Sequence, residues 1–171
     1  NLDDKVAWYK NDGSENFTST TISSAADSAR SVFAIDVDGD GDIDLLSASY
    51  NDDKIAWYKN DGSENFTVHT ISVAADGAYS VYAIDVDSDG DIDVLSASQT
   101  DDKIAWYEND GSENFTPHTI SVAADGARSV FAIDVDSDGD IDVLSASSGD
   151  NKIAWYENDG SENFAASTIS V

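Results

Sequence analysis

Aspartates at every second position mark three short stretches of the sequence. In the middle one, residues 85–93, five aspartates alternate with other residues, and Gly90 follows the third aspartate. Neighbouring carboxylates repel each other, so a solvated surface does not require such regular placement. Calcium does, because it takes about six to eight oxygen ligands, and a glycine at the sixth position allows the loop to turn sharply. The pattern therefore predicts one calcium ion in each stretch.

Each predicted calcium loop provides side-chain ligands from positions 1, 3, 5 and 9 and a backbone carbonyl from position 7. The predicted side-chain ligands are Asp36, Asp38, Asp40, Asp44, Asp85, Asp87, Asp89, Asp93, Asp134, Asp136, Asp138 and Asp142. The predicted carbonyl ligands belong to Asp42, Asp91 and Asp140. We expect three calcium ions per chain. The alternative is an acidic, solvated turn, which the recurrence of the spacing in three places disfavours.

These loops do not have the features of an EF-hand. An EF-hand carries a bidentate glutamate at position 12, whereas the three loops have Ser47, Ser96 and Ser145 there. The flanking segments, such as residues 31–35, are rich in strand-forming residues and lack a helical stripe. The loops are therefore expected to connect strands.

The composition is that of an acidic chain with enough apolar residues for a core. The 171 residues, a length typical of one domain, are 40% hydrophobic and carry a net charge of -27, from 35 acidic and 8 basic residues. This charge disfavours nucleic acid and anionic membranes as partners, and no apolar run is long enough to insert into a bilayer. There is no cysteine for a disulfide. The acidic surface favours an extracellular or cell-surface location.

A repeat of 49 residues organises the whole sequence, as the spacing of Trp8, Trp57, Trp106 and Trp155 shows. Each repeat contains four candidate strands, and the last two are joined by a turn with an Asp-Gly pair, which is typical of hairpins. In one repeat the expected strands are residues 79–86, 92–98, 103–108 and 115–122. Short strands separated by turns predict an all-β antiparallel meander.

The third strand of each repeat is apolar on both faces. Ile104 and Trp106 should point one way, and Ala105 and Tyr107 the other. A two-sheet sandwich would leave one face polar. Four-stranded antiparallel sheets packed face to face around an axis bury both faces, so the pattern predicts a β-propeller.

Residues 130–147, followed by Lys-Ile-Ala-Trp-Tyr-Glu-Asn-Asp-Gly at 152–160, resemble the FG-GAP/VCBS repeat. That repeat forms the blades of integrin-α-type propellers and of many bacterial secreted proteins. The resemblance covers the whole chain, and it implies calcium between the first and second strands of a blade and usually seven blades. The Phe-Gly pair of integrin blades is absent, and Ala78-Tyr79 and Ala127-Arg128 lie near its position.

The chain accounts for about 3.5 blades. The predicted divisions are an outer half-blade at 1–24 and blades at 25–73, 74–122 and 123–171. Residues 1–8 match the loop before a third strand and the beginning of that strand, and Val171 ends a fourth strand. A closed ring needs at least about four blades. We therefore expect another chain, or a further part of the natural chain, to complete the ring, and we favour a longer chain or a cleaved partner over a second copy.

The repeats differ from one another mainly in the loops at the end of the blades opposite the calcium loops. The possible ligand surface there comprises Arg30, Tyr50, Tyr79, Gln99, Arg128 and Ser148. Neutral drift on exposed loops is the alternative. The tryptophans are expected in the core between blades rather than on a sugar-binding platform, and two isolated histidines, His69 and His118, are weak evidence for a metal or a base.

Together these features predict a calcium-stabilised extracellular binding or adhesion module that recognises a protein or a glycan, as a lectin does. An enzyme is disfavoured, because near-identical blades leave no single asymmetric site, and no nucleophile–base pair recurs. Two alternatives stay open. One is a structural subunit that self-assembles by completing blades between chains, and the other is the non-catalytic part of a larger secreted enzyme.

Overall fold

A computed structural model describes residues 4–170, and within this range it contains strands, loops and no helix. The described residues leave out Asn1, Leu2, Asp3 and Val171. The predicted start of the half-blade at residue 1 and the predicted end of the last blade at residue 171 therefore lie outside them. The strands are β1 (Val6–Asn11), β2 (Phe17–Ser23), β3 (Ala29–Ile35), β4 (Asp44–Ser49), β5 (Lys54–Asn60), β6 (Phe66–Ser72), β7 (Ala78–Ile84), β8 (Asp93–Ser98), β9 (Lys103–Asn109), β10 (Phe115–Ser121), β11 (Ala127–Ile133), β12 (Asp142–Ser147), β13 (Lys152–Asn158) and β14 (Phe164–Ser170).

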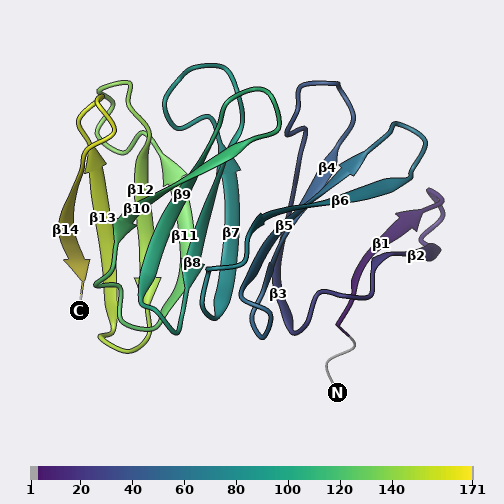
Figure 1. The fold of residues 1–171 in the computed structure, drawn as a ribbon, viewed down its shortest axis with the longest axis horizontal. Helices are drawn as coiled ribbons and strands as arrows, with labels where there is room; N and C mark the ends of the chain where they lie inside the picture. The colour runs from purple at the N-terminus through teal and green to yellow at the C-terminus, as the bar shows by residue number, and fades with distance from the viewer. Residues whose placement is uncertain (1–3, 171) are drawn as a thin grey trace.

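The strands form one two-stranded sheet, β1-β2, and three four-stranded antiparallel sheets, β3 to β6, β7 to β10 and β11 to β14. Every strand pairs with its neighbours in sequence, which makes each sheet a meander. The sheets stand side by side and face to face, as Figure 1 shows. The first strands of the blades are neighbours, because β7 contacts both β3 and β11. The predicted all-β propeller of four-stranded blades is confirmed, as an open arrangement of part of a ring.

The apolar residues on the two faces of each third strand belong to different cores. Trp106 and Ile104 on β9 pack into the core shared with the following blade, which includes Val130. Ala105 and Tyr107 pack into the core shared with the preceding blade, which includes Trp57. The prediction that both faces are buried is therefore confirmed, and the alternation of side chains along one strand holds three blades together.

Two of the strand ends predicted for residues 79–122 were wrong beside the aspartate loop. β7 ends at Ile84 rather than Val86, and β8 begins at Asp93 rather than Ile92. The reason is the Asp85 carboxylate, which accepts a hydrogen bond from the Gly90 backbone N–H at 3.0 Å and bends the chain away from the sheet. Val86 nevertheless points inward and is buried, so its apolar character reflects loop packing rather than strand pairing. Three other ends differ by one residue, since β7 begins at Ala78, β9 reaches Asn109 and β10 stops at Ser121. The predicted ends at Ser98, Lys103 and Phe115 are confirmed.

The four tryptophans have different surroundings. Trp57 and Trp106 are each 1% exposed between blades, as predicted, whereas Trp8 and Trp155 are partly exposed. Trp155 lies on the face of the last sheet that carries no further blade among residues 4–170. Trp8, together with Tyr9 and Leu45, lines an apolar cavity of about 370 Å³ between the two-stranded sheet and the blade formed by β3 to β6.

Among the described residues, no helix has the length and apolarity to cross a membrane.

Candidate metal centres and ligand surface

Each aspartate loop connects the first and second strands of a blade: β3 to β4, β7 to β8, and β11 to β12. The first aspartate folds the loop back on itself. Asp36 accepts hydrogen bonds from the backbone N–H groups of Gly39 and Gly41, both at 2.9 Å. The sixth residue has a φ of +94° to +103° in the three loops, a conformation that favours glycine. The repeated glycine of the sequence pattern is therefore required by the backbone.

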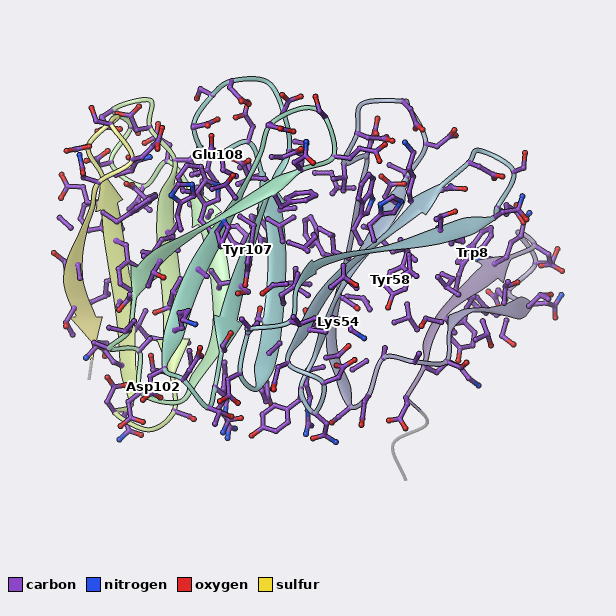
Figure 2. The ribbon with its side chains drawn as sticks, in the orientation of Figure 1. Trp8, Lys54, Tyr58, Asp102, Tyr107 and Glu108 are labelled. Carbon is purple, nitrogen blue, oxygen red and sulfur yellow. The ribbon has the colours of Figure 1, made fainter. Side chains whose placement is uncertain are left out.

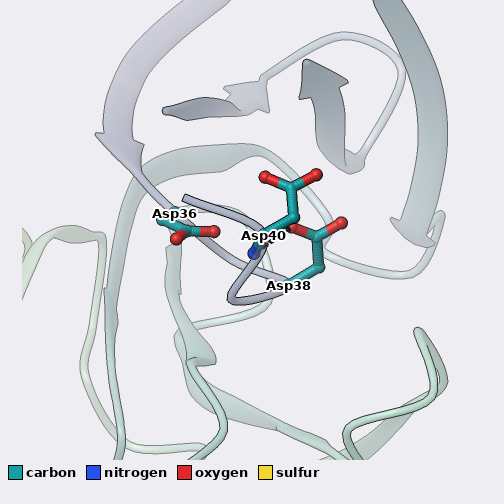
Figure 3. A group of neighbouring side chains, drawn as sticks. All are labelled: Asp36, Asp38 and Asp40. Atoms are coloured by element: carbon teal, nitrogen blue, oxygen red, sulfur yellow. Dashed lines mark hydrogen bonds between the residues drawn. The ribbon is translucent and has the colours of Figure 1, made fainter. Parts of the chain in front are cut away.

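Three carboxylates converge in each loop. One oxygen from each of three aspartates lies within 4.8 Å of the others, and the groups are Asp36, Asp38 and Asp40; Asp85, Asp87 and Asp93; and Asp134, Asp136 and Asp142. Figure 3 shows the first group. Asp85 Oδ1 is buried and has no hydrogen-bond partner. A buried acceptor oxygen among carboxylates fits a hard, oxygen-preferring cation such as calcium.

Some of the predicted ligands lie outside these groups. Asp44 is not part of the group formed by Asp36, Asp38 and Asp40. Asp89 and Asp138, the fifth residues of the second and third loops, are likewise not part of the groups in their own loops. Asp89 and Asp138 are exposed, and their Oδ1 atoms accept hydrogen bonds at 2.9 Å from the backbone N–H groups of Asp91 and Asp140. The full set of side-chain ligands stays a prediction.

The ninth aspartate has a second role that the sequence pattern did not reveal. Asp44 is fully buried, and its carboxylate accepts hydrogen bonds from Val37 N at 3.2 Å, Trp57 Nε1 at 2.9 Å and Asn60 N at 2.7 Å. It thereby ties the loop to the third strand of its own blade. Asp93 accepts the corresponding hydrogen bonds from the backbone N–H groups of Val86 and Asn109. Asp142 accepts them from Val135 and Asn158.

Burial has an electrostatic cost at this position. It raises the pKa of Asp44 and raises the pKa of Asp93 to about 6, because desolvation disfavours the charged form more strongly than the hydrogen bonds favour it.

The sequence does contain a signal for the hydrogen bonds between the ninth aspartate and the third strand. The tryptophan thirteen residues after the ninth aspartate and the asparagine sixteen residues after it recur in every blade.

The seventh aspartate faces the Asp-Gly hairpin that joins the third and fourth strands. A Cβ atom placed on Gly62 would lie 2.4 Å from Asp42 Oδ2, and Gly111 and Gly160 stand in the same relation to Asp91 and Asp140. The hairpin glycine therefore makes room for this side chain. With its carboxylate directed at the hairpin, the seventh residue is left with its carbonyl as the predicted calcium ligand, and that role stays a prediction.

The three centres differ in their charged neighbours. Lys59 Nζ lies 2.5 Å from Asp38 Oδ2 and 2.6 Å from Glu113 Oε1 of the next blade. Burial raises the pKa of Asp38, but the hydrogen bond from Lys59 and the other contacts outweigh it, so the pKa is lowered. In the next blade Glu108 replaces the lysine. Burial, followed by nearby carboxylates that include Glu108, raises the pKa of Asp87.

The histidines lie on fourth strands, where they pack on tryptophans. The His69 ring lies tilted against Trp57 with ring centroids 4.8 Å apart, and the His118 ring stacks on Trp106 at 4.7 Å. His118 Nε2 also lies 2.8 Å from Glu108 Oε2. No histidine joins a group of potential metal ligands among residues 4–170, so the structure gives them packing contacts.

The possible ligand surface lies at the other end of the blades. Figure 2 shows this separation in one blade, where Asp102 marks the end with the β8–β9 loop and Glu108 the end with the aspartate loops. The structure brings Arg30, Tyr50, Tyr79 and Arg128 into contact. Gln99 and Ser148 lie in the adjoining loops, where their backbone N–H groups donate hydrogen bonds to Gly77 O and Gly126 O.

The sequence profile of the FG-GAP-like repeat matches residues 1–47, 36–96, 85–145 and 134–171. The chain belongs to the FG-GAP-like repeat family. Consecutive matches overlap at the three aspartate loops, so the loops occupy equivalent places in each FG-GAP-like unit. This agrees with the resemblance seen in the sequence.

The fold is similar to that of a lectin from Agrocybe aegerita, whose structure describes specific recognition of non-reducing terminal N-acetylglucosamine. The TM-score is 0.63 at 16% sequence identity, and the alignment covers 95% of this FG-GAP-like chain and 46% of the lectin chain. The chain thus spans about half the length of that lectin. No curated protein matches the chain. At this identity the likeness concerns the fold.

Proposed function

We propose that the chain is a calcium-stabilised recognition module that acts outside the cell and binds a protein or a glycan without catalysing a reaction. The observation that carries the calcium proposal is the convergence of three carboxylates in each of three equivalent loops. Like charges held within 4.8 Å repel one another strongly. A divalent cation in each loop would convert this repulsion into attraction and cross-link a chain that has no disulfide.

The proposed calcium ions have a structural rather than a catalytic role. The loops are tied to the blade core through Asp44, Asp93 and Asp142, so an ion bound there would be coupled to the packing of the third strand. Calcium sites of extracellular modules commonly have dissociation constants of about 10⁻⁴ to 10⁻³ M. Such sites are filled where calcium is abundant, which supports the extracellular location.

Support for recognition comes from the division of each blade into two different ends. The aspartate loops are nearly identical among blades, whereas the opposite end carries different residues in equivalent positions, such as Arg30, Tyr79 and Arg128. A rigid scaffold that presents variable loops is a common arrangement for binding. The glycan-binding lectin with a similar fold is in keeping with a sugar as the ligand, although its likeness concerns the fold.

Two measurements test this function. Elemental analysis after dialysis against dilute calcium should find three ions per chain, and a chelator should lower the melting temperature markedly, because folded-state binding stabilises by mass action. A chain without bound calcium and with an unchanged melting temperature would contradict the calcium proposal. Glycan and peptide arrays, probed with the calcium-loaded chain, test recognition. A chain that binds nothing on either array would contradict it.

A second candidate function is assembly through the open half-blade. Within the described residues β1 pairs with β2 alone, and the adjoining cavity of about 370 Å³ is lined by Trp8, Ile43 and Phe66. An unpaired strand edge beside an apolar cavity favours completion by further strands, from a second copy or from another part of the natural chain.

Native mass spectrometry of the calcium-loaded chain tests the assembly candidate. Complexes should form, and Tyr9→Lys should weaken them, because the exposed Tyr9 ring lines the cavity. Val122→Lys is the control, since Val122 is similarly exposed but lies outside the cavity. A stable 18.2 kDa monomer would contradict assembly from copies of this chain. Equal effects of the two lysine variants would show that the cavity is not the contact.

A further inference from the structure

The two arginines of the chain, Arg30 and Arg128, occupy equivalent positions. Each is the second residue of the first strand of its blade, on β3 and β11, and the equivalent residue of β7 is Tyr79. Because β7 contacts both β3 and β11, the three side chains start from neighbouring strands at one end of the blades. The aspartate loops lie at the opposite end.

Tyr79 holds both guanidinium groups. Arg128 Cζ lies 5.3 Å and Arg30 Cζ 5.6 Å from the centroid of its ring. Arg30 also lies 5.2 Å from the Tyr50 ring, which meets Tyr79 edge to face at 6.4 Å. Cation–π contacts of this kind fix a guanidinium through its flat face. The N–H groups at its edge are left for other partners.

Neither guanidinium group is paired with a carboxylate within the described part of the chain. Among residues 4–170 the ion pairs are formed by lysines and by His118, and none includes an arginine. This is unexpected in a chain with 35 acidic residues. At the same end of the blades, Asp52, Asp101 and Asp150 are each paired with a lysine. These three acids are thus engaged, and Asp27, in the loop before Arg30, accepts a hydrogen bond from Asn51 Nδ2 at 3.0 Å. The two exposed arginines remain available to an external anion.

The chemistry of the surroundings indicates which kind of anion. An arginine fork matches a carboxylate in two parallel hydrogen bonds. The adjoining loops carry hydroxyl and amide groups: Tyr50 OH, whose ring contacts Arg30, lies 3.5 Å from Thr100 Oγ1, and Gln99 and Ser148 occupy the positions equivalent to Tyr50. Such groups suit the hydroxyls of a sugar. The net charge of -27 repels extended polyanions such as nucleic acid, so the ligand should carry few charges.

We propose that Arg30, Arg128, Tyr79 and Tyr50 form a binding site for a carboxylate-bearing saccharide, such as a short uronic acid oligomer. The inference rests on the proposed recognition function and specifies its ligand class. In the site the arginines contact the carboxylates, Tyr79 acts as a positioning residue that holds both arginines, and the loop hydroxyls and amides contact the sugar ring.

Calorimetric titration of the calcium-loaded chain with digalacturonic acid tests the site, with its dimethyl ester as the uncharged probe. The acid should bind, and the ester should bind at least tenfold more weakly. Arg30→Gln and Arg128→Gln should each weaken binding of the acid at least tenfold. Lys103→Gln is the matched control, because it removes one positive charge from the same end of the blades, but from a lysine that is paired with Asp101. The affinity of this variant for the acid should stay within about twofold of that of the unchanged chain.

Further variants distinguish a positioning role from a structural one. Tyr79→Phe keeps the ring and should retain binding, whereas Tyr79→Ala should lose it, with melting temperature and calcium content of both variants measured to show that they fold. Equal binding of acid and ester, equal effects of the arginine and Lys103 variants, or no binding of the acid would each overturn the proposed site. Binding of a short glutamate peptide in place of the sugar would also overturn it.

These outcomes separate the two proposals. If array ligands bind and the arginine variants do not affect them, the recognition function stands and the acidic-sugar site is wrong. If neither the arrays nor the digalacturonic acid titration shows binding, both proposals fail.

Discussion

Asp44 offers a way to separate a structural carboxylate from a metal-binding one. Its side chain is fully buried and accepts three hydrogen bonds, from Val37 N, Trp57 Nε1 and Asn60 N. In Asp44→Asn the shape is kept, and the remaining carbonyl oxygen can serve the first two donors. The new amide group then faces the Asn60 N–H, where the carboxylate oxygen lies 2.7 Å away. Two donors meet, and one buried N–H loses its partner.

The magnitude follows from this lost contact. A buried donor without a partner costs about 1–3 kcal/mol, and hydrogen bonds to a charged acceptor contribute roughly 1.5–3 kcal/mol each. Removing the charge offsets part of the loss, because burial already raises the pKa of Asp44 and so disfavours its ionised form. We therefore expect Asp44→Asn to lower the free energy of unfolding by about 2–4 kcal/mol. For a domain of this size, the melting temperature falls by about 2–4 °C per kcal/mol.

The assay is urea unfolding at pH 7 in excess chelator, so that calcium affinity does not contribute. Asp40→Asn is the matched control, because Asp40 is exposed and its Oδ1 accepts a single bond, from Asp42 N at 2.9 Å. Its unfolding free energy should change by less than about 0.5 kcal/mol. In a calcium titration, Asp40→Asn should weaken the first centre. If the two variants are equally stable in chelator, the structural role assigned to the ninth aspartate is refuted.

Three further predictions concern the same loops. Asp89→Ala should weaken calcium binding at the second centre strongly, whereas Asp91→Ala should weaken it less because its carbonyl remains, and equal losses in a calcium titration would show that the ligand register is wrong. Lys59→Glu should raise the calcium affinity of the first centre by replacing the ammonium beside Asp38 with a carboxylate, and calorimetry that shows no gain would contradict the charge argument. In the calcium-free chain, burial raises the pKa of Asp93 from its usual value of 3.8 to about 6, so the folded state binds more protons than the unfolded state. The free energy of unfolding should therefore fall as pH rises from about 4 to 6, by up to roughly 3 kcal/mol from this group. Denaturant unfolding of the chain and of Asp93→Asn at several pH values checks this, and the same pH dependence in both would show that other carboxylates are responsible.

The repeat and its local chemistry were predictable from sequence because they depend on short spacings. Alternating aspartates with a glycine at the sixth position indicate a cation loop, and apolar residues on both faces of residues 104–107 require sheets on both sides. These patterns arise within a few residues and recur in each blade. They sufficed for the all-β propeller and for the FG-GAP-like family.

Tertiary structure decided what depends on residues far apart in the sequence. Asp44 binds the Asn60 backbone, and Asp42 faces Gly62. Lys59 bridges to Glu113 of the next blade. These contacts follow from how the strands and loops pack against one another. The contact of Arg30 and Arg128 with one tyrosine is of the same kind, because these residues are separated by two repeats and meet only when β7 lies between β3 and β11. A spacing in the sequence determines which side chains share a strand face, whereas the stacking of blades determines which of them touch.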